Sequence, residues 1–135
     1  MKEDIFNSVC AFLGSFIVWF WGGADNSIYI LVALSTMDYV SGVLAAGVLH
    51  KLSSAIGFKG IAGKIYIFIL VGITNVIGRE LLGEHAGLLR EAVIFFYIAN
   101  EGISILENAC HIGIPIPAVL KKLLEKIKDN SDKAD

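Results

Sequence analysis

Long apolar blocks alternate with short polar connections along this chain. Four such blocks cover about residues 5–21, 28–49, 61–82 and 88–112. A hydrocarbon core of roughly 30 Å takes about 20 helical residues to cross, with a range of about 17 to 25. Backbone groups in lipid must be hydrogen-bonded within their own segment, so each block is predicted to be a helix. The pattern therefore predicts an all-α, polytopic membrane protein with about four transmembrane helices.

The lysines and arginines predict how these helices are oriented. The connection at residues 22–26 contains neither residue type, whereas the next connection contains Lys51 and Lys59, with Lys64 just beyond it. The C-terminal tail is the most lysine-rich region. Basic residues flanking membrane helices gather on the cytoplasmic side. We therefore expect both termini in the cytoplasm, and Lys59 and Lys64 at the membrane surface on that side.

The first block also has features of a secretory signal. Lys2 precedes an apolar run that ends at the small residues Gly22, Gly23 and Ala24. However, residues 19–21 are Trp-Phe-Trp, which are bulky where a signal peptidase needs small side chains and are typical of an interfacial aromatic belt. We expect the first helix to be retained, with cleavage as the open alternative.

Composition and motifs argue against a soluble enzyme. Of 135 residues, 56% are hydrophobic and only 18% are charged, and the mean hydropathy is +0.70, which is more apolar than an ordinary soluble domain. No nucleophile elbow, phosphate-binding loop or zinc-protease motif is present. Gly57, Gly60 and Gly63 lack phosphate-loop spacing, so we expect a turn entering the third helix. Cys10 and Cys110 lack metal-ligand spacing. We expect no cofactor, metal or nucleic-acid partner.

Asp38 is the least expected residue of the second block. A charge at the middle of a bilayer costs roughly 2.5 to 3.5 kcal/mol on insertion scales, so its side chain must face protein, water or a partner. Ser41, Gly42 and Ala45 follow at offsets of three, four and seven, which places them on the same helical face. Such small, polar faces let membrane helices approach closely. Asp38 is expected to pair either within one chain or between subunits.

The fourth block repeats this pattern. Glu101 shares a face with Tyr97, Ser104 and Asn108, and Asn100 precedes it, so the helix is amphipathic although it lies in a membrane. Such a face either lines water or packs against another polar face. Glu101 and Asp38 would lie at comparable depth, where two carboxylates can share a proton. The predicted buried polar, oligomer-forming or pore-lining site consists of Asp38, Ser41, Gly42, Asn100, Glu101, Ser104 and Asn108.

The last segment is predicted to leave the membrane. Gly113, Pro115 and Pro117 end the fourth helix, so residues 1–112 form the predicted membrane domain and residues 113–135 a cytoplasmic segment. Residues 118–128 predict an amphipathic helix, either on the anionic membrane surface or in a bundle between subunits. Its expected surface lysines are Lys121, Lys122 and Lys126. Residues 129–135 are predicted to be disordered.

Two motifs resemble a known family. The run Asn-Glu-Gly-Ile-Ser-Ile-Leu-Glu-Asn at residues 100–108, followed by Gly-Ile-Pro-Ile-Pro-Ala-Val-Leu-Lys at residues 113–121, is similar to the phage-lysis and toxin-secretion holins of Gram-positive phages and clostridia. Asp38 ahead of small residues and the serines, glycines and lysine of residues 53–64 support the resemblance. Gly63 departs from it, since family members often have a second basic residue there.

The resemblance implies a non-enzymatic protein of the bacterial cytoplasmic membrane. Such a protein forms homo-oligomeric holes through which an endolysin, or a toxin, leaves the cell and cytolysis follows, and an antiholin is a further possible partner. A small proton-coupled exporter is the alternative from another class, but those proteins carry an essential Glu in the first helix, where this chain has no acid beyond Asp4. An antiholin or membrane scaffold is the third reading.

Overall fold

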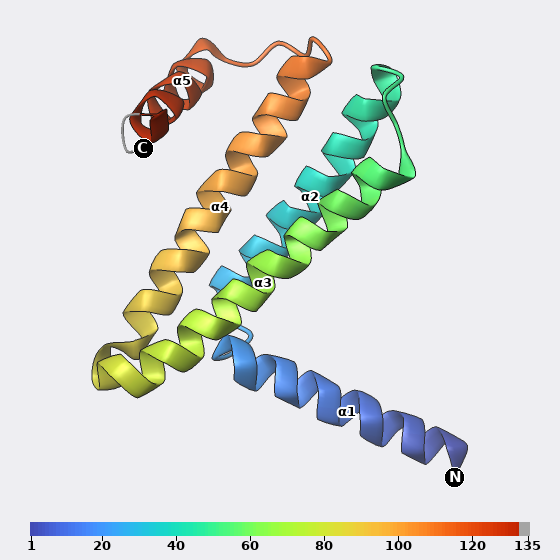
Figure 1. Ribbon diagram of the computed structural model, residues 1–135, viewed down its shortest axis with the longest axis vertical. Coiled ribbons are helices and arrows are strands. Elements are labelled where there is room, and N and C mark those ends of the chain that lie inside the picture. Colours follow the sequence, from blue (N-terminus) through green and yellow to red (C-terminus); the bar gives the residue numbers. More distant parts are fainter. Residues whose placement is uncertain (133–135) are drawn as a thin grey trace.

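The computed structural model describes residues 1–132, and every regular element in that range is helical. Figure 1 shows long helices packed side by side, another helix projecting away from them and a shorter helix near the C-terminus. The elements are α1 (Lys2–Trp21), α2 (Asn26–Val48), α3 (Ser54–Leu82), the 3-10 turn η1 (Gly83–His85), α4 (Ala86–His111) and α5 (Ala118–Asp132). The predicted all-α class is confirmed.

Within residues 1–132, three helical stretches are long and apolar enough to cross a membrane. They are Lys2–Trp21, Asn26–Val48 and Ser54–His111, and the last has 58 residues. A straight helix of that length would measure about 87 Å, far more than one bilayer. The chain instead reverses at η1, so that α3 and α4 run back along one another (Figure 1). The structure thus has helices of membrane length, and the number of crossings stays a prediction.

Local hydrogen bonds set where the helices begin and end. The Asp25 side chain accepts a hydrogen bond from the backbone N–H of Ile28, and Ser53 does the same for Ile56, at 3.2 Å each. Both are N-caps that satisfy a donor of the first turn. Because Ser53 starts α3, the glycine-rich stretch of residues 57–63 is helical, which corrects the turn expected there.

The core lies where α4 packs against both α2 and α3. Its buried apolar residues come from all three helices: Ile28, Leu31, Ile67, Val71 and Ile94. The helices α2 and α3 contact each other much less than either contacts α4. As a result α4 is the central helix of the bundle, and its side chains reach both neighbours.

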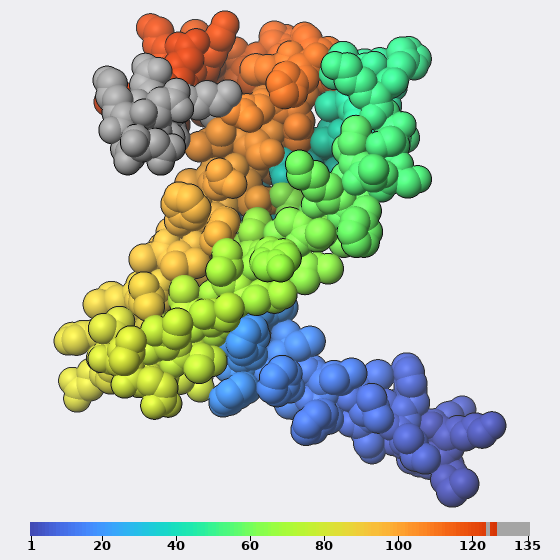
Figure 2. Space-filling view, viewed as in Figure 1, coloured from blue at the N-terminus to red at the C-terminus, as the bar shows by residue number. Residues whose placement is uncertain are grey.

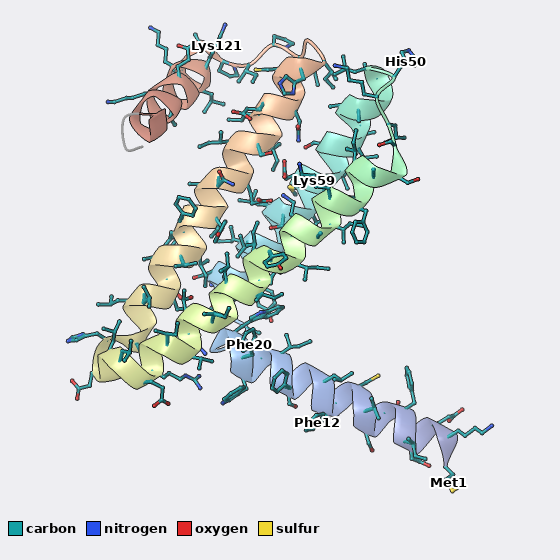
Figure 3. The ribbon with its side chains drawn as sticks, in the orientation of Figure 1. Met1, Phe12, Phe20, His50, Lys59 and Lys121 are labelled. Carbon is teal, nitrogen blue, oxygen red and sulfur yellow. The ribbon has the colours of Figure 1, made fainter. Side chains whose placement is uncertain are left out.

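Helix α1 packs only through its C-terminal end. The Phe20 ring lies so close to Gly72 that a Cβ at that glycine would be 1.8 Å from it. The amide of Asn75 donates to the Phe20 carbonyl oxygen at 3.0 Å, and the indole N–H of Trp21 donates to the Phe68 carbonyl oxygen at 3.2 Å. No residue of α1 is buried. Figures 2 and 3 show the rest of α1, including Phe12 and Met1, projecting from the bundle.

Helix α5 follows a short connection that contains Pro115 and Pro117. Lys121, Lys122 and Lys126 are exposed on it, and so are Val119 and Leu123. The helix continues to Asp132, so the disorder predicted from residue 129 is wrong for residues 129–132. The remainder of that prediction, residues 133–135, lies outside the described residues.

Candidate functional site

One lysine from α3 joins carboxylates from α2 and α4 inside the bundle. The ammonium of Lys64 donates to Asp38 Oδ2 and to Glu101 Oε2. Asp38 is 8% exposed and Glu101 only 2%. We call these three residues the ion cluster. Its position near the middle of all three helices is where membrane proteins rarely place charge without a function.

The side chain of Tyr39 makes a local contact between α2 and α3 next to Lys64. Tyr39 of α2 lies against α3, where a Cβ at Gly60 would meet its ring at 3.2 Å and one at Gly57 would meet its hydroxyl at 3.5 Å. The absence of side chains at these two glycines lets the tyrosine sit between the helices. The long side chain of Lys64, which remains partly exposed, extends beside it to the carboxylates.

Asn108 of α4 completes the contact between the polar faces of α2 and α4. Its side-chain N–H groups donate to Asp38 Oδ1 at 3.1 Å and to Ser41 Oγ at 2.9 Å. A Cβ at Gly42 would lie 3.5 Å from the Asn108 amide nitrogen. Gly42 therefore permits the approach. The faces that the sequence predicted on two separate helices meet within one chain.

The ion cluster holds two carboxylates for one ammonium. If all three groups are ionised, one negative charge remains uncompensated within the cluster. Breaking a buried ion pair by removing one partner is strongly destabilising, because the remaining charge is left unpaired. Where the sequence suggested that Asp38 and Glu101 share a proton, the structure places the Lys64 ammonium in contact with both. The cluster therefore locks three helices into one arrangement.

A small cavity of about 280 Å³ opens next to the ion cluster. It is lined by polar groups that include Asp38, Lys64, Ser104 and Asn108, with Gly57 and Gly60 on the α3 side. Ser104 thus lies beside the cluster, as its place on the α4 face predicted. The cavity gives the polar face space for water without moving the helices.

The remaining predicted residues are Asn100 and the lysines, and most of them are exposed. Asn100 is exposed and does not contact the ion cluster. Lys59 is exposed, as are the three lysines of α5. Lys64 lies about three turns inside α3, and its ammonium contacts two acids. Its expected place at the membrane surface stays a prediction.

A second charged cluster lies at the end of the bundle where α1 connects to α2, and the sequence reasoning missed it. Arg90 of α4 is 4% exposed. Its guanidinium donates to the Trp21 and Gly23 carbonyl oxygens and to both carboxylate oxygens of Asp25. Arg90 also pairs with Glu91, whose other oxygen accepts from Ser27 Oγ at 2.8 Å. The α1–α2 connection is thereby fastened to α4.

The electrostatics of this second cluster favour an ionised Asp25. The hydrogen bond from Arg90 is the main cause that holds the pKa of Asp25 below its ordinary value of 3.8, against a smaller opposing effect of burial. One signal in the sequence could have predicted the pair. The four-helix topology puts the 22–26 connection and the start of the fourth helix on the same side of the membrane, where an Asp and an Arg can meet.

The side chains of residues 1–132 that could bind a metal ion are scattered. This range contains no group of three or more His, Cys, Asp or Glu side chains placed to hold a metal ion. Cys10 and Cys110 are both exposed free thiols on different helices.

A family model and several known proteins match this chain over most of its length. The model of the Bacteriophage holin family matches residues 15–129. An uncharacterised protein of Listeria monocytogenes is 50% identical over 111 residues, covering 82% of this chain and 78% of the relative. An uncharacterised protein of Clostridium perfringens is 36% identical over 121 residues, covering 90% and 89%.

A phage protein is also among the relatives. A probable holin of Bacillus phage phi105 is 35% identical over 103 residues, which cover 76% of this chain and 75% of the phage protein. No solved structure matches the chain. With a family model that spans most of its length and relatives aligned over three quarters or more of theirs, this chain belongs to the Bacteriophage holin family, a non-enzymatic class of membrane-permeabilising proteins.

Proposed function

We propose that this protein is a holin that accumulates in a bacterial cytoplasmic membrane, oligomerises there and forms holes that release an endolysin, so that the host lyses. Family membership and the phage relative support the class. The observation that carries the mechanism is the ion cluster, which closes the polar face of α4 against α2 and α3 within one chain. A toxin is the alternative cargo.

The proposed topology has four crossings with both termini in the cytoplasm. Helices α3 and α4 have 29 and 26 residues, so each is long enough to cross alone. The α1–α2 connection and the α3–α4 turn lie at the same end of the bundle, as the bond between Asp25 and Arg90 requires (Figure 1). The opposite end has the lysine-containing α2–α3 connection, which supports placing that end in the cytoplasm.

The α5 helix belongs on the cytoplasmic membrane surface in this topology. Its lysines Lys121, Lys122 and Lys126 are exposed, and exposed apolar side chains at Val119 and Leu123 accompany them. Each lysine near an anionic leaflet contributes about 1 kcal/mol of attraction. The segment from residue 113 onward thus anchors the end of α4 without entering the bilayer.

The single chain is the closed state in this proposal. Its buried charged side chains, Asp38, Arg90 and Glu101, all form ion pairs. The helix surfaces outside the bundle are apolar, with large exposed side chains such as Phe58, Tyr66 and Phe96. Such a subunit is compatible with lipid and does not conduct. It can therefore accumulate without harming the cell.

Assembly opens the ion cluster. In the oligomer, Glu101 and Asn108 of α4 exchange their partners in the same chain for water. Ser104 contacts the same water, and the polar face lines the hole. The closed and open arrangements form a bistable element that concentration shifts. Membrane potential adds to this shift, because moving one elementary charge across the membrane is worth about 2.3 kcal/mol per 100 mV.

Induced expression in a bacterium tests the proposal, with and without a co-expressed endolysin that lacks an export signal. Culture density and membrane potential are followed over time. The proposal predicts abrupt depolarisation after a delay, and lysis only when the endolysin is present. Normal growth and potential, with the protein detected in the membrane, would refute it in favour of an antiholin, exporter or scaffold.

A further inference from the structure

An apolar groove of about 540 Å³ opens between α1, α2 and α3 on the bundle surface. Val32, Ser35 and Thr36 of α2 form one wall, and Ile65 and Phe68 of α3 form the other. The last turn of α1 closes one end through Phe20 and Trp21. The groove lies on the side of α2 and α3 that α4 does not cover.

One polar atom of this groove has no partner. Ser35 is 3% exposed, and its Oγ is the one buried side-chain oxygen or nitrogen of the described residues without a hydrogen bond. Leaving a buried hydroxyl unpaired costs about 1 to 3 kcal/mol. Lipid tails offer no hydrogen bond, so filling the groove with lipid leaves Ser35 unpaired. A helix with small and polar side chains is a better match.

Helix α1 has a face of that kind. Asn7, Cys10, Ala11 and Gly14 follow one another at offsets of three, four and seven, so they share one side of the helix. The bulky side chains Ile5, Val9, Phe12, Leu13 and Phe16 lie on the other side. A Cβ at Gly14 would meet nothing within 4 Å, and no residue of α1 is buried. Small faces of this type let membrane helices approach closely.

The chain's own α1 does not fill the groove. The contacts of Phe20 with Gly72 and of Trp21 with Phe68 hold the last turn of α1 on α3, and from there the helix leads away from the bundle (Figures 1 and 3). Phe20 and Trp21 are themselves part of the groove wall. Entry of the same helix would break the contacts that define the groove, so the occupant must come from another molecule.

We propose that α1 of one copy docks into the α2–α3 groove of a second copy, with its small face toward Ser35. This inference deepens the proposed function and rests on it for the requirement that copies assemble. With α1 crossing the bilayer antiparallel to α2, as the proposed four-crossing topology requires, the two positions have the same depth. Cys10 lies eleven residues from Trp21, or about 16 Å along α1, and Thr36 lies ten residues from Asn26, or about 15 Å along α2. In that arrangement Cys10 of one copy faces Thr36 of the next.

The proposed contact joins two different surfaces, α1 of one copy and the α2–α3 groove of another. The joined pair therefore still has one unused α1 and one unused groove. Each molecule gives its α1 to one neighbour and receives α1 from another. Such heterologous contacts produce rings when the rotation closes and open chains when it does not. An array that grows by one copy at a time is a direct route from single closed subunits to a large assembly.

Disulfide cross-linking in membranes tests the contact with two co-expressed copies of different size. One copy retains Cys10 and carries Cys110→Ser. The other carries Cys10→Ser, Cys110→Ser and Thr36→Cys. Oxidation is expected to give a heterodimer band at least several-fold stronger than a matched partner with Met37→Cys, which is at the same depth but outside the groove lining. Equal yields at positions 36 and 37, or no band, would overturn the proposal.

A second experiment asks whether the chain's own α1 fills the groove. It uses one chain that retains Cys10 and carries Cys110→Ser and Thr36→Cys. A bond within this chain, seen as loss of free thiols without a dimer, would mean that its own α1 fills the groove and would also overturn the proposal. Depolarisation and endolysin release are recorded from the same cells. Permeabilisation without the cross-link would refute the contact alone, whereas the cross-link without permeabilisation would refute the proposed holin function and leave the contact standing.

A second variant tests the small face directly. Gly14→Leu adds bulk where the single chain has open space, so it is expected to leave the monomer intact but to lower the heterodimer yield several-fold. Gly47→Leu is the matched control, since Gly47 is also an exposed helical glycine with nothing within 4 Å of a Cβ. Equal yields for the two variants would contradict docking through this face.

Discussion

Lys64 has a different role from the other lysines of the chain, because it is the shared partner of two buried acids. The exposed Lys59 lies five residues earlier on the same helix and has no such partner. Because the Lys64 ammonium pairs with carboxylates on α2 and α4, it stabilises the packing of α3 against both helices. The same arrangement makes its removal costly, since both carboxylates lose their counter-charge at once.

Lys64→Met is expected to destabilise the folded subunit by about 3 kcal/mol or more, because Asp38 and Glu101 remain buried without the ammonium. Unfolding in detergent measures the loss. Lys59→Met is the control and should change stability by less than about 0.5 kcal/mol. Adding Asp38→Asn and Glu101→Gln to Lys64→Met should recover most of the loss, and failure of this rescue would show that packing, not charge, explains it.

Asp38→Asn and Glu101→Gln each remove one of the two ion pairs with Lys64 while nearly preserving side-chain shape. We expect an earlier onset of depolarisation after induction, because the closed arrangement loses one of its ties between helices. The onset time at matched membrane levels is the measurement. Asn100→Ala, on the same helix but exposed, should leave the onset unchanged. Unchanged onset in both acid variants would leave the ion cluster without the proposed role.

The Asp25–Arg90 pair predicts that the stability of the folded protein depends on pH. The pKa of Asp25 is lowered in the folded protein, so its ionised form stabilises the fold above the ordinary value of 3.8, and this contribution disappears as the pH falls through the lowered pKa. The Tm difference between the native protein and Asp25→Asn should be constant from about pH 7 to about pH 5 and shrink below about pH 4. A difference that does not change with pH would contradict the assignment.

Helix boundaries explain why the sequence showed the acidic faces of two helices but not the surroundings of Lys64. Hydropathy placed the start of the third helix at residue 61, so Lys64 seemed to lie in its first turn. The Ser53 cap starts α3 at Ser54, about two turns earlier, and Lys64 is then internal. By contrast, the faces of α2 and α4 depend only on spacing within a helix, and spacing is visible in the sequence. Which faces meet depends on tertiary packing, which spacing does not encode.

Close backbone approach fixes the hairpin of α3 and α4. Gly78 is buried, and a Cβ there would lie 2.8 Å from the Ala86 carbonyl oxygen, which belongs to the backbone and cannot rotate away. Gly78→Ala is therefore expected to lower stability in detergent by about 1 to 3 kcal/mol. Gly102→Ala is the control in open space and should be neutral or stabilising by up to about 1 kcal/mol. Similar effects of the two substitutions would argue against a tight hairpin.

The whole molecule combines buried ion pairs with an apolar core and an apolar exterior. The sequence was sufficient for this plan, because long apolar blocks and buried charges are properties of composition and periodicity. It was insufficient for α1, whose apolar sequence predicts a membrane helix but does not show what packs against it. The second cluster around Arg90 was missed for a related reason: the contact is made between a loop and a helix that are 65 residues apart, and hydrophobic periodicity gives no information on such pairs.

The central claim is that the polar face of α4 is closed within the subunit and faces water in the assembled hole. Tyr97→Cys, with Cys10→Ser and Cys110→Ser, tests it most directly. Tyr97 shares the Glu101 face and packs against the buried core. Phe96→Cys is the control, because Phe96 is exposed on the apolar surface of the same helix.

Membranes are isolated before and after the onset of depolarisation, opened so that both faces meet the reagent, and labelled with a charged maleimide that does not enter lipid. The proposal predicts that position 97 is unreactive before onset and reactive afterwards, whereas position 96 is unreactive throughout. Position 97 remaining unreactive after onset, in membranes that have become permeable, would contradict a water-lined α4 face.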